Sequence, residues 1–239
     1  MHYFFLDSSR IEASRAVLEG SEAAHLKNVL RFTHGDSVGL VDGSGYEYQA
    51  RVDRLAPGRV ELCITDRRRS AGLPSMHIDA AQGYLKDKKM DRVVRQLAEL
   101  GVARFIPFTS VRAVVRPESG RASSRRERWH RIAVEALKQC RRGNLMGIAD
   151  TVDFGDLLAT GRSYDLPILF WEGAAHALTP QPAAEATRGA RSVLAVLGPE
   201  GGFSKEEAAA AQAAGFRIAK LGPRILRADT AAISALTLW

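Results

Sequence analysis

Two glycine-proline turns near the C-terminal end carry the residue types best suited to binding a ligand. The first lies in SVLAVLGPEGGFSKEE (192–207) and the second in FRIAKLGPRILRADTAAISAL (216–236). In each, an apolar run typical of a buried strand stops at Gly-Pro, and a helix is predicted after the loop. The glycines allow the backbone to approach a ligand closely, because they carry no Cβ. The two segments therefore predict a ligand site at the carboxyl ends of neighbouring strands, as in open α/β sheets.

The glycine-rich first loop does not match the familiar phosphate-binding signatures. A Walker A loop requires Lys directly after its last glycine, whereas Gly202 is followed by Phe203. The G-x-G-x-x-G pattern of dinucleotide sites is also missing. Ser204 and Glu207 instead form an S-x-x-E capping box, and Gly215 is placed to end that helix. A nucleotide-like cofactor would therefore need a binding site of another architecture than the Walker A loop or the dinucleotide fold.

The elements that position these loops belong to an α/β pattern. From residue 76 onward, apolar runs typical of strands alternate with helical periodicity, which predicts a mostly parallel sheet covered by helices. A helix is expected over 86–100, ended by Gly101, and another over 124–140. The other expected strands are 105–108 and 166–171, and the second of these ends beside Glu172. Three strand ends could thus converge on one ligand.

The N-terminal third has a different pattern. Short β-rich runs and tight turns extend to about Arg69, which predicts a small barrel or sandwich with one helix capped by Ser21. The segment 67–74, rich in Arg, Ser, Gly and Pro, is the expected linker. We therefore predict two domains, residues 1–70 and residues 71–239.

Composition and charge limit the classes of function. The net charge of +7 and the pI near 9.7 favour a polyanionic partner, and the arginines occur in clusters. No apolar stretch is long enough to span a membrane and no export signal is recognised, so a cytoplasmic protein is expected. Cys63 and Cys140 belong to no metal-ligand pattern and are expected to be buried free thiols, with no metal bound.

Four segments, in order along almost the whole chain, resemble one family. They are HLKNVLRFTHGDSV (25–38), QLAELGVARFIPFTSVRAV (96–114), EALKQCRRGN (135–144), and the pair LGPEGGF and LGPRILR with the Thr-Ala-rich helix that follows. Together they resemble the SPOUT methyltransferases, specifically those that methylate uracil N3 in 16S ribosomal RNA. The resemblance implies a C-terminal SPOUT domain with a deep trefoil knot, an N-terminal PUA-like RNA-binding β-barrel, and a homodimer.

The resemblance also implies the ligands and the residues that hold them. S-adenosylmethionine would lie in the knot loops, and the RNA partner would be 16S ribosomal RNA or the small ribosomal subunit. The implied cofactor-binding residues are Trp171, Glu172, Leu197, Gly198, Pro199, Gly201, Gly202, Leu221, Gly222, Ile225 and Leu226. The expected RNA-binding residues are His25, Lys27, Arg31, Arg125, Arg126, Arg141 and Arg142.

Methylation of uracil N3 requires that the imide proton leaves and that the negative charge on O2 and O4 is stabilised. Arg227, in the second loop, is the candidate cation that would stabilise this charge. The alternative interpretation is that Arg227 has a structural role and pairs with Asp229. Glu172, Glu200, Glu135 and Asp229 all remain candidates for the base.

This chain departs from the family at two positions: it has Ala228-Asp229-Thr230 where the family usually carries Thr-Glu-Thr, and Asn144 where Pro is frequent. The chain stops at Trp239, which implies a short last helix or a truncation. Two other functions stay open. One is a SPOUT methyltransferase for a ribose 2′-hydroxyl or a tRNA base, and the other is a noncatalytic RNA-binding factor in ribosome assembly.

Overall fold

A computed structural model describes residues 1–12, 14–70, 76–86, 88–114, 120 and 122–239. The chain divides into two compact units, which are described separately. One comprises residues 1–73 with 134–145, and the other residues 74–133 with 146–239. The expected linker, 67–74, is wrong in its first part, because residues 67–69 end strand β6 (Arg59–Arg69) and pair within the sheet. Residues 71–74 of that segment lie outside the described residues, and the domain boundary after residue 70 stays a prediction.

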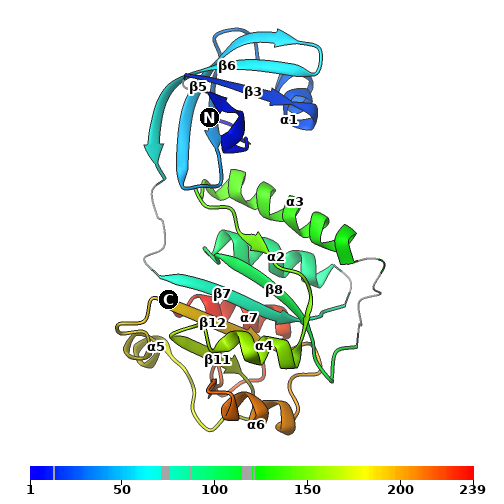
Figure 1. Cartoon of the computed structure of the whole chain (residues 1–239), viewed down its shortest axis with the longest axis vertical. Coiled ribbons are helices and arrows are strands. Elements are labelled where there is room, and N and C mark those ends of the chain that lie inside the picture. The colour runs from blue at the N-terminus through cyan, green and yellow to red at the C-terminus, as the bar shows by residue number, and fades with distance from the viewer. Residues whose placement is uncertain (13, 71–75, 87, 115–119, 121) are drawn as a thin grey trace. The chain divides into compact units, whose positions relative to one another are not determined.

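The N-terminal unit is built on a mixed six-stranded sheet (Figure 1). Its order is β1 (Tyr3–Phe5), β4 (Ser37–Val41), β5 (Tyr46–Ala56), β6 (Arg59–Arg69), β3 (Arg15–Glu19) and β2 (Ile11–Glu12). β1 and β4 pair in parallel, and the remaining pairs are antiparallel. Alternate residues on these strands, among them Phe4, Leu40 and Leu62, are almost completely buried in one core. The expected β-rich N-terminal domain is confirmed.

The helix of this unit begins two residues earlier than predicted. α1 (Gly20–Ala24) continues into a π-helical turn (His25–Val29), and Glu19 stands at the N-cap position without a side-chain capping bond. The prediction that Ser21 caps this helix is wrong, because the chain passes directly from β3 into the helix and Ser21 already lies in its first turn. A 3-10 turn, η1 (Ser8–Arg10), precedes β2 and is capped by Asp7.

Residues 134–145 belong to this unit through several contacts. Lys138 forms an ion pair with Glu22 at 2.8 Å, and the N–H of Gly45 donates to the carbonyl of Gly143 at 3.1 Å. Arg141 stacks over the ring of Tyr3. The C-terminal end of α3 (Ala122–Cys140) is therefore attached to the N-terminal sheet.

The C-terminal unit has a seven-stranded sheet in which every pairing is parallel. Its order is β10 (Val152–Asp153), β8 (Arg104–Thr109), β7 (His77–Gly83), β12 (Ser192–Leu197), β11 (Leu166–Phe170) and β13 (Arg217–Ala219), and β9 (Gly147–Ile148) also pairs with β8. The predicted parallel sheet is thus confirmed.

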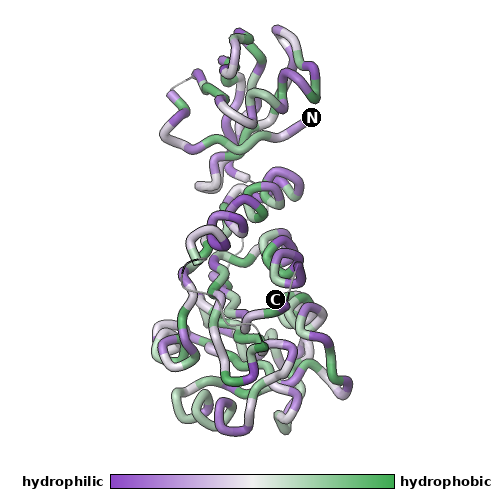
Figure 2. Tube along the Cα trace, turned by 90° about the vertical axis from the view of Figure 1, so that its right-hand side faces the viewer, coloured by the Kyte–Doolittle hydropathy of each residue, from purple (hydrophilic) through white to green (hydrophobic). Residues whose placement is uncertain are grey.

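Helices pack on the buried strands of this sheet (Figure 1). Leu194 and Val196 of β12 share a core with Leu157 of α4 (Phe154–Gly161) and Ala211 of α6 (Lys205–Ala213). The intervening β12 side chains point to the opposite face, where α7 (Ala228–Leu236) packs on β12 and on α2 (Lys89–Glu99). Burial on both faces explains why β12, SVLAVL, is an almost continuous apolar run. Figure 2 shows hydrophobic stretches of the chain in the interior of this unit. α5 (Pro180–Ala186) connects β11 to β12.

Both cysteines are free, but the prediction that they are buried is wrong: Cys63 is exposed and Cys140 is half-buried. Cys63 points outward because its strand neighbour Leu62 points into the core, and alternate residues face opposite sides. None of the described helices is both long and apolar enough to cross a membrane.

Candidate active site

Three parallel strands end at the same edge of the C-terminal sheet and form a pocket of about 520 Å³. β11 lies between β12 and β13 and pairs in parallel with both. The two glycine-proline loops therefore do not follow neighbouring strands as expected, since a third strand separates them. This arrangement adds Phe170, Trp171 and Glu172 at the end of β11 to the pocket.

The structure brings together every residue that the sequence assigned to cofactor binding, and Arg227 with them. All of these side chains or backbone segments line the pocket: Trp171, Glu172, Leu197, Gly198, Pro199, Gly201, Gly202, Leu221, Gly222, Ile225, Leu226 and Arg227. Their clustering follows from the parallel topology, because the carboxyl ends of parallel strands meet at one edge.

The first loop is held by bonds at both of its ends. At its C-terminal end, where α6 begins, the predicted capping box is present. The N–H of Glu207 donates to Ser204 Oγ at 3.1 Å, and the N–H of Ser204 donates to Glu207 Oε2 at 2.9 Å. At its start, Gln82 of β7 donates from Nε2 to the carbonyl of Gly198 at 2.8 Å. Gln82 is fully buried, and its Oε1 has no hydrogen-bond partner among the described residues.

The middle of the first loop is anchored by Glu200. Its carboxylate accepts from the N–H of Lys86 at 3.2 Å and from Lys89 Nζ at 2.9 Å. Partial burial works to raise the pKa of Glu200, but the bonds from Lys89 and Lys86 outweigh it and lower the pKa. Lys86 precedes α2, which begins at Lys89 rather than at 86 as predicted. Glu200 is a structural anchor that stays ionised.

The second loop has far fewer contacts. Gly222 has φ +136°, a conformation that favours glycine, and a Cβ placed there would meet no atom within 4 Å. Ile225 is 85% exposed. Arg227 occupies the N-cap position of α7, which begins at Ala228, and its side chain makes no capping bond.

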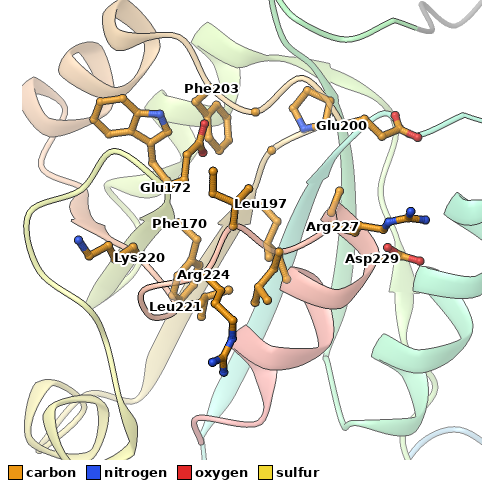
Figure 3. Close-up of a pocket in the computed structure, with 18 of the residues that line it drawn as sticks. Phe170, Glu172, Leu197, Glu200, Phe203, Lys220, Leu221, Arg224, Arg227 and Asp229 are labelled. Carbon is orange, nitrogen blue, oxygen red and sulfur yellow. The ribbon is translucent and has the colours of Figure 1, made fainter.

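Charged groups of both signs surround the pocket (Figure 3). Arg227, Asp229 and Glu200 lie at one end, and Glu172 and Phe203 lie at the other. The alternative role for Arg227, pairing with Asp229, is not what the structure shows: the carboxylate of Asp229 faces Arg92 Nη1 at 3.9 Å. Among the described residues, no ion pair engages the Arg227 guanidinium, so it is free to meet an anionic group.

The structure separates the four candidates for the base. Glu135 lies on α3, is 68% exposed and pairs with Lys138 at 2.7 Å, so it does not line the pocket. Glu200 anchors a loop, and a lowered pKa makes it a weak base. Glu172 and Asp229 line the pocket and remain.

Sequence reasoning missed several residues of this site. Gln82 could have been noticed as the one polar residue near the end of the strand HIDAAQG, at the sheet edge where ligands bind. Lys89 and Lys220 also line the pocket, but nothing in their local sequence distinguishes them from solvated lysines.

The residues assigned to RNA binding fall in both units. His25, Lys27 and Arg31 are exposed on the N-terminal unit. Arg141 is exposed there, whereas burial lowers the pKa of the half-buried Arg142. In the C-terminal unit, Arg125 lies over the ring of Tyr84 at 5.7 Å, and Arg126 forms an ion pair with Asp150 at 3.0 Å. Their role in RNA binding stays a prediction.

No group of three or more His, Cys, Asp or Glu residues suited to a metal ion occurs within the described part of the chain. The pocket is lined by the exposed backbone of glycines, by apolar side chains and by charged side chains. Such a surface suits a polar organic ligand that carries charge of its own.

Comparisons with known proteins identify the family. Residues 72–239 match the RNA methyltransferase domain, and residues 18–63 match the RNA methyltransferase PUA domain. Ribosomal RNA small subunit methyltransferase E of Aquifex aeolicus is 31% identical over 100% of this chain and 98% of its own length. The enzyme of that name from Bacillus subtilis is 27% identical over 99% of this chain and 95% of its own length.

A solved structure agrees with the sequence relatives. The crystal structure of ribosomal RNA small subunit methyltransferase E from Neisseria gonorrhoeae, bound to S-adenosyl methionine, superposes with a TM-score of 0.88. It is 27% identical and covers 99% of this chain and 95% of that chain. The chain therefore belongs to the RNA methyltransferase family, with a PUA domain preceding the methyltransferase domain, that includes ribosomal RNA small subunit methyltransferase E.

Proposed function

We propose that this protein transfers the methyl group of S-adenosylmethionine to N3 of a uracil in 16S ribosomal RNA of the small subunit. The observation that carries the proposal is the single pocket formed by both glycine-proline loops, with the Arg227 guanidinium at its edge. The relatives named above act, by their names, on the RNA of the small ribosomal subunit.

The pocket fits S-adenosylmethionine in size and chemistry. Its volume of about 520 Å³ is within the range of small-molecule sites, roughly 300 to 1,000 Å³. The space beside Gly222 leaves backbone accessible to polar atoms of a ligand. The carboxylate of Glu172, for which no described residue supplies an ion pair, would meet a cationic group, and the exposed faces of Trp171 and Ile225 would meet apolar ones.

The sulfonium-bound methyl of S-adenosylmethionine is electrophilic without a metal, so the protein must position a nucleophile in line with it and exclude water. Uracil N3 becomes nucleophilic only when it loses its proton. We infer that Arg227 donates hydrogen bonds to the uracil carbonyl that carries the resulting charge. Arg227 suits this role because its planar guanidinium can present two donors to one ligand.

The proton of N3 must pass to a base or to solvent. Of the two carboxylates that remain, Asp229 lies at the same end of the pocket as Arg227, and Glu172 lies at the other end (Figure 3). We therefore infer that Asp229 is the better placed acceptor and that Glu172 serves the cofactor. The single-turnover rate is expected to rise with pH, since deprotonation precedes or accompanies transfer.

The decisive experiment combines binding and product analysis. Calorimetry measures S-adenosylmethionine binding to the purified full chain, and methyl transfer is then assayed with free 16S ribosomal RNA and with assembled small subunits. Mass spectrometry of the digested RNA should show 3-methyluridine. A 2′-O-methylated nucleoside or a modified tRNA base would indicate the alternative specificity, and absence of cofactor binding would indicate a noncatalytic assembly factor.

The resemblance also leads us to infer a homodimer with a trefoil knot in the methyltransferase domain. Ala232 and Ala235 of α7 are fully buried within the chain, which fits the close packing that a knot needs. A dimeric mass by light scattering at micromolar concentration is expected. A cytoplasmic location stays a prediction from the sequence.

A further inference from the structure

A second cavity, of about 250 Å³, lies within the N-terminal unit. It is bordered by Ser8, Ile11, Asp42, Ser44, Tyr48 and Arg67. This volume is below that of typical cofactor pockets, roughly 300 Å³ or more, and suits a single planar group. The residues that border it come from η1, β2, the turn after β4, and the hairpin of β5 and β6.

Asp42 is a wall residue of this cavity that hydrogen bonds hold in one position. It is 7% exposed, and its Oδ1 accepts from the N–H of Ser44 at 2.8 Å and of Tyr46 at 3.4 Å. Its Oδ2 accepts from Ser44 Oγ at 2.7 Å and from the hydroxyl of Tyr48 at 2.9 Å. These four donors occupy the acceptor positions of one carboxylate, so Asp42 fixes the cavity wall and has no capacity left for a ligand.

Tyr48 is held in its donating form. Burial, followed by the hydrogen bond to Asp42, raises the pKa of Tyr48, so its hydroxyl stays protonated at neutral pH. The tyrosine therefore supplies a fixed aromatic wall beside Asp42. Ile11, which is half-buried, supplies an apolar one.

Arg67 provides the cationic side of the cavity. Its guanidinium lies 4.0 Å from the centroid of the Tyr46 ring and 5.7 Å from that of Tyr48, within the range of cation–π contacts. Its neighbour Arg68 is paired with Glu47 at 3.1 Å. Arg67 also interacts with the side chain of Tyr48 by a hydrogen bond. No ion pair of Arg67 occurs within the described residues, so its charge and its other hydrogen-bond donors remain for a ligand.

These features match the chemistry of an unpaired nucleotide. Single-stranded RNA is recognised by stacking bases on aromatic rings and on arginine planes, together with contacts from arginine to phosphate. A cavity with an aromatic wall, an apolar wall and a ring-stacked arginine offers both kinds of contact. Ser8, at the exposed rim, adds a hydroxyl that can donate or accept.

We propose that this cavity binds one unpaired nucleotide of the RNA substrate, with the base stacked against the Arg67 guanidinium and the adjacent phosphate accepting from it. The proposal rests on the proposed function in that the chain acts on RNA. It assigns a role to a specific pair, Tyr46 and Arg67, rather than to the general charge of the unit.

The test measures binding of the full-length protein to a fluorescently labelled, unstructured RNA oligonucleotide by anisotropy, with the same strand in a duplex as the comparison. Arg67→Ala should weaken single-strand binding by about tenfold, the scale of one lost base stack. Arg51→Ala removes the same charge from an exposed position of β5 that does not border the cavity, and should weaken it by no more than about threefold. The duplex should not distinguish the two variants.

A second pair of variants tests the stack itself. Tyr46→Phe keeps the ring under Arg67 and should bind like wild type, whereas Tyr46→Leu keeps the charge but removes the ring and should bind like Arg67→Ala. Thermal unfolding checks that each variant is folded. Equal single-strand affinities for Arg67→Ala and Arg51→Ala, or for the two Tyr46 variants, would overturn the proposal.

The outcomes also separate this proposal from the proposed function. If wild type methylates RNA and Arg67→Ala does so equally well at subsaturating RNA, the nucleotide site is wrong and the activity stands. If wild type binds single-stranded RNA through Arg67 but transfers no methyl group, the site stands and the proposed activity fails.

Discussion

The two glycine-proline loops of the pocket differ in how the rest of the protein holds them. The first is bonded through Gln82 at its start, Glu200 in its middle and the capping box at its end. The second has an exposed Ile225, a glycine at φ +136° and an Arg227 side chain for which no described residue supplies an ion pair. A rigid loop thus faces a loop that few contacts restrain.

This difference suggests that the two loops have different roles, the first in cofactor binding and the second in substrate binding. Preorganised groups bind a ligand without losing further conformational freedom, which suits the first loop to a cofactor that must be held in one orientation. A loop with unpaired donors can adjust to a second, larger substrate. We therefore expect substitutions in the second loop to affect catalysis, and substitutions in the anchors of the first to affect cofactor binding and stability.

The largest effect is expected for Arg227→Ala. If Arg227 stabilises the charge on uracil, the single-turnover rate should fall on the order of a hundredfold, as on removing one oxyanion donor. Binding of S-adenosylmethionine should change little. Arg227→Lys should recover only part of the rate, because an ammonium group lacks the planar two-donor geometry. A rate for Arg227→Ala within about threefold of wild type would show that another group carries the charge.

The glycines of the two loops should respond differently to the same substitution. At Gly222 a Cβ meets no neighbour, but the backbone conformation is unfavourable for valine, so Gly222→Val should reduce cofactor affinity by more than about tenfold through backbone strain of roughly 1–3 kcal/mol. The melting temperature should change by only a few degrees.

Gly198→Val tests the anchored loop. A Cβ at Gly198 would lie 3.1 Å from the ring of Phe203, which is 1% exposed and stacks on Phe108. Valine there should disturb this core and lower the melting temperature more than Gly222→Val does. Similar melting temperatures in the two variants, measured by calorimetry, would contradict the contrast between the loops.

Gln82 offers a finer test of the first loop. Gln82→Leu removes the donor to Gly198 and leaves a partly buried carbonyl without that bond, so cofactor affinity should fall about fivefold to tenfold, corresponding to roughly 1–1.4 kcal/mol. In Gln82→Glu the carboxylate would face carbonyl oxygens and repel them, but its protonated form can donate again. Cofactor affinity of that variant should recover as pH falls, whereas the affinity of Gln82→Leu should show no such recovery.

The sequence predicted the parts of this site that depend on local chemistry. The capping box at Ser204 and Glu207 and the turns at Gly198 and Gly222 follow from short-range rules, and the parallel topology then brings the loops to one edge. The family resemblance added the identity of the ligands, which local rules do not provide.

What the sequence could not supply depends on distant contacts. The position of β11 between β12 and β13 is set by how the chain crosses the sheet, which no local pattern encodes. Glu200 is anchored by Lys86 and Lys89, more than a hundred positions away in the chain. Its role as an anchor, rather than a base, could be recognised only once those partners were located.

The smallest expected effect concerns the pH dependence of that anchor. The pKa of Glu200 is lowered in the folded protein from its ordinary value of 4.5, so the folded state favours the ionised carboxylate. Its contribution to stability is therefore fully present above pH 4.5 and is lost as the pH falls through the lowered folded pKa. Because Glu200 and Lys89 are partly exposed, with side chains 25% and 43% accessible, this contribution should be below about 1 kcal/mol. Denaturant unfolding of wild type and Glu200→Gln should thus give a difference in free energy at pH 7 that shrinks in acid. A difference that stays constant down to acid pH would mean that the ionised form of Glu200 does not hold the first loop.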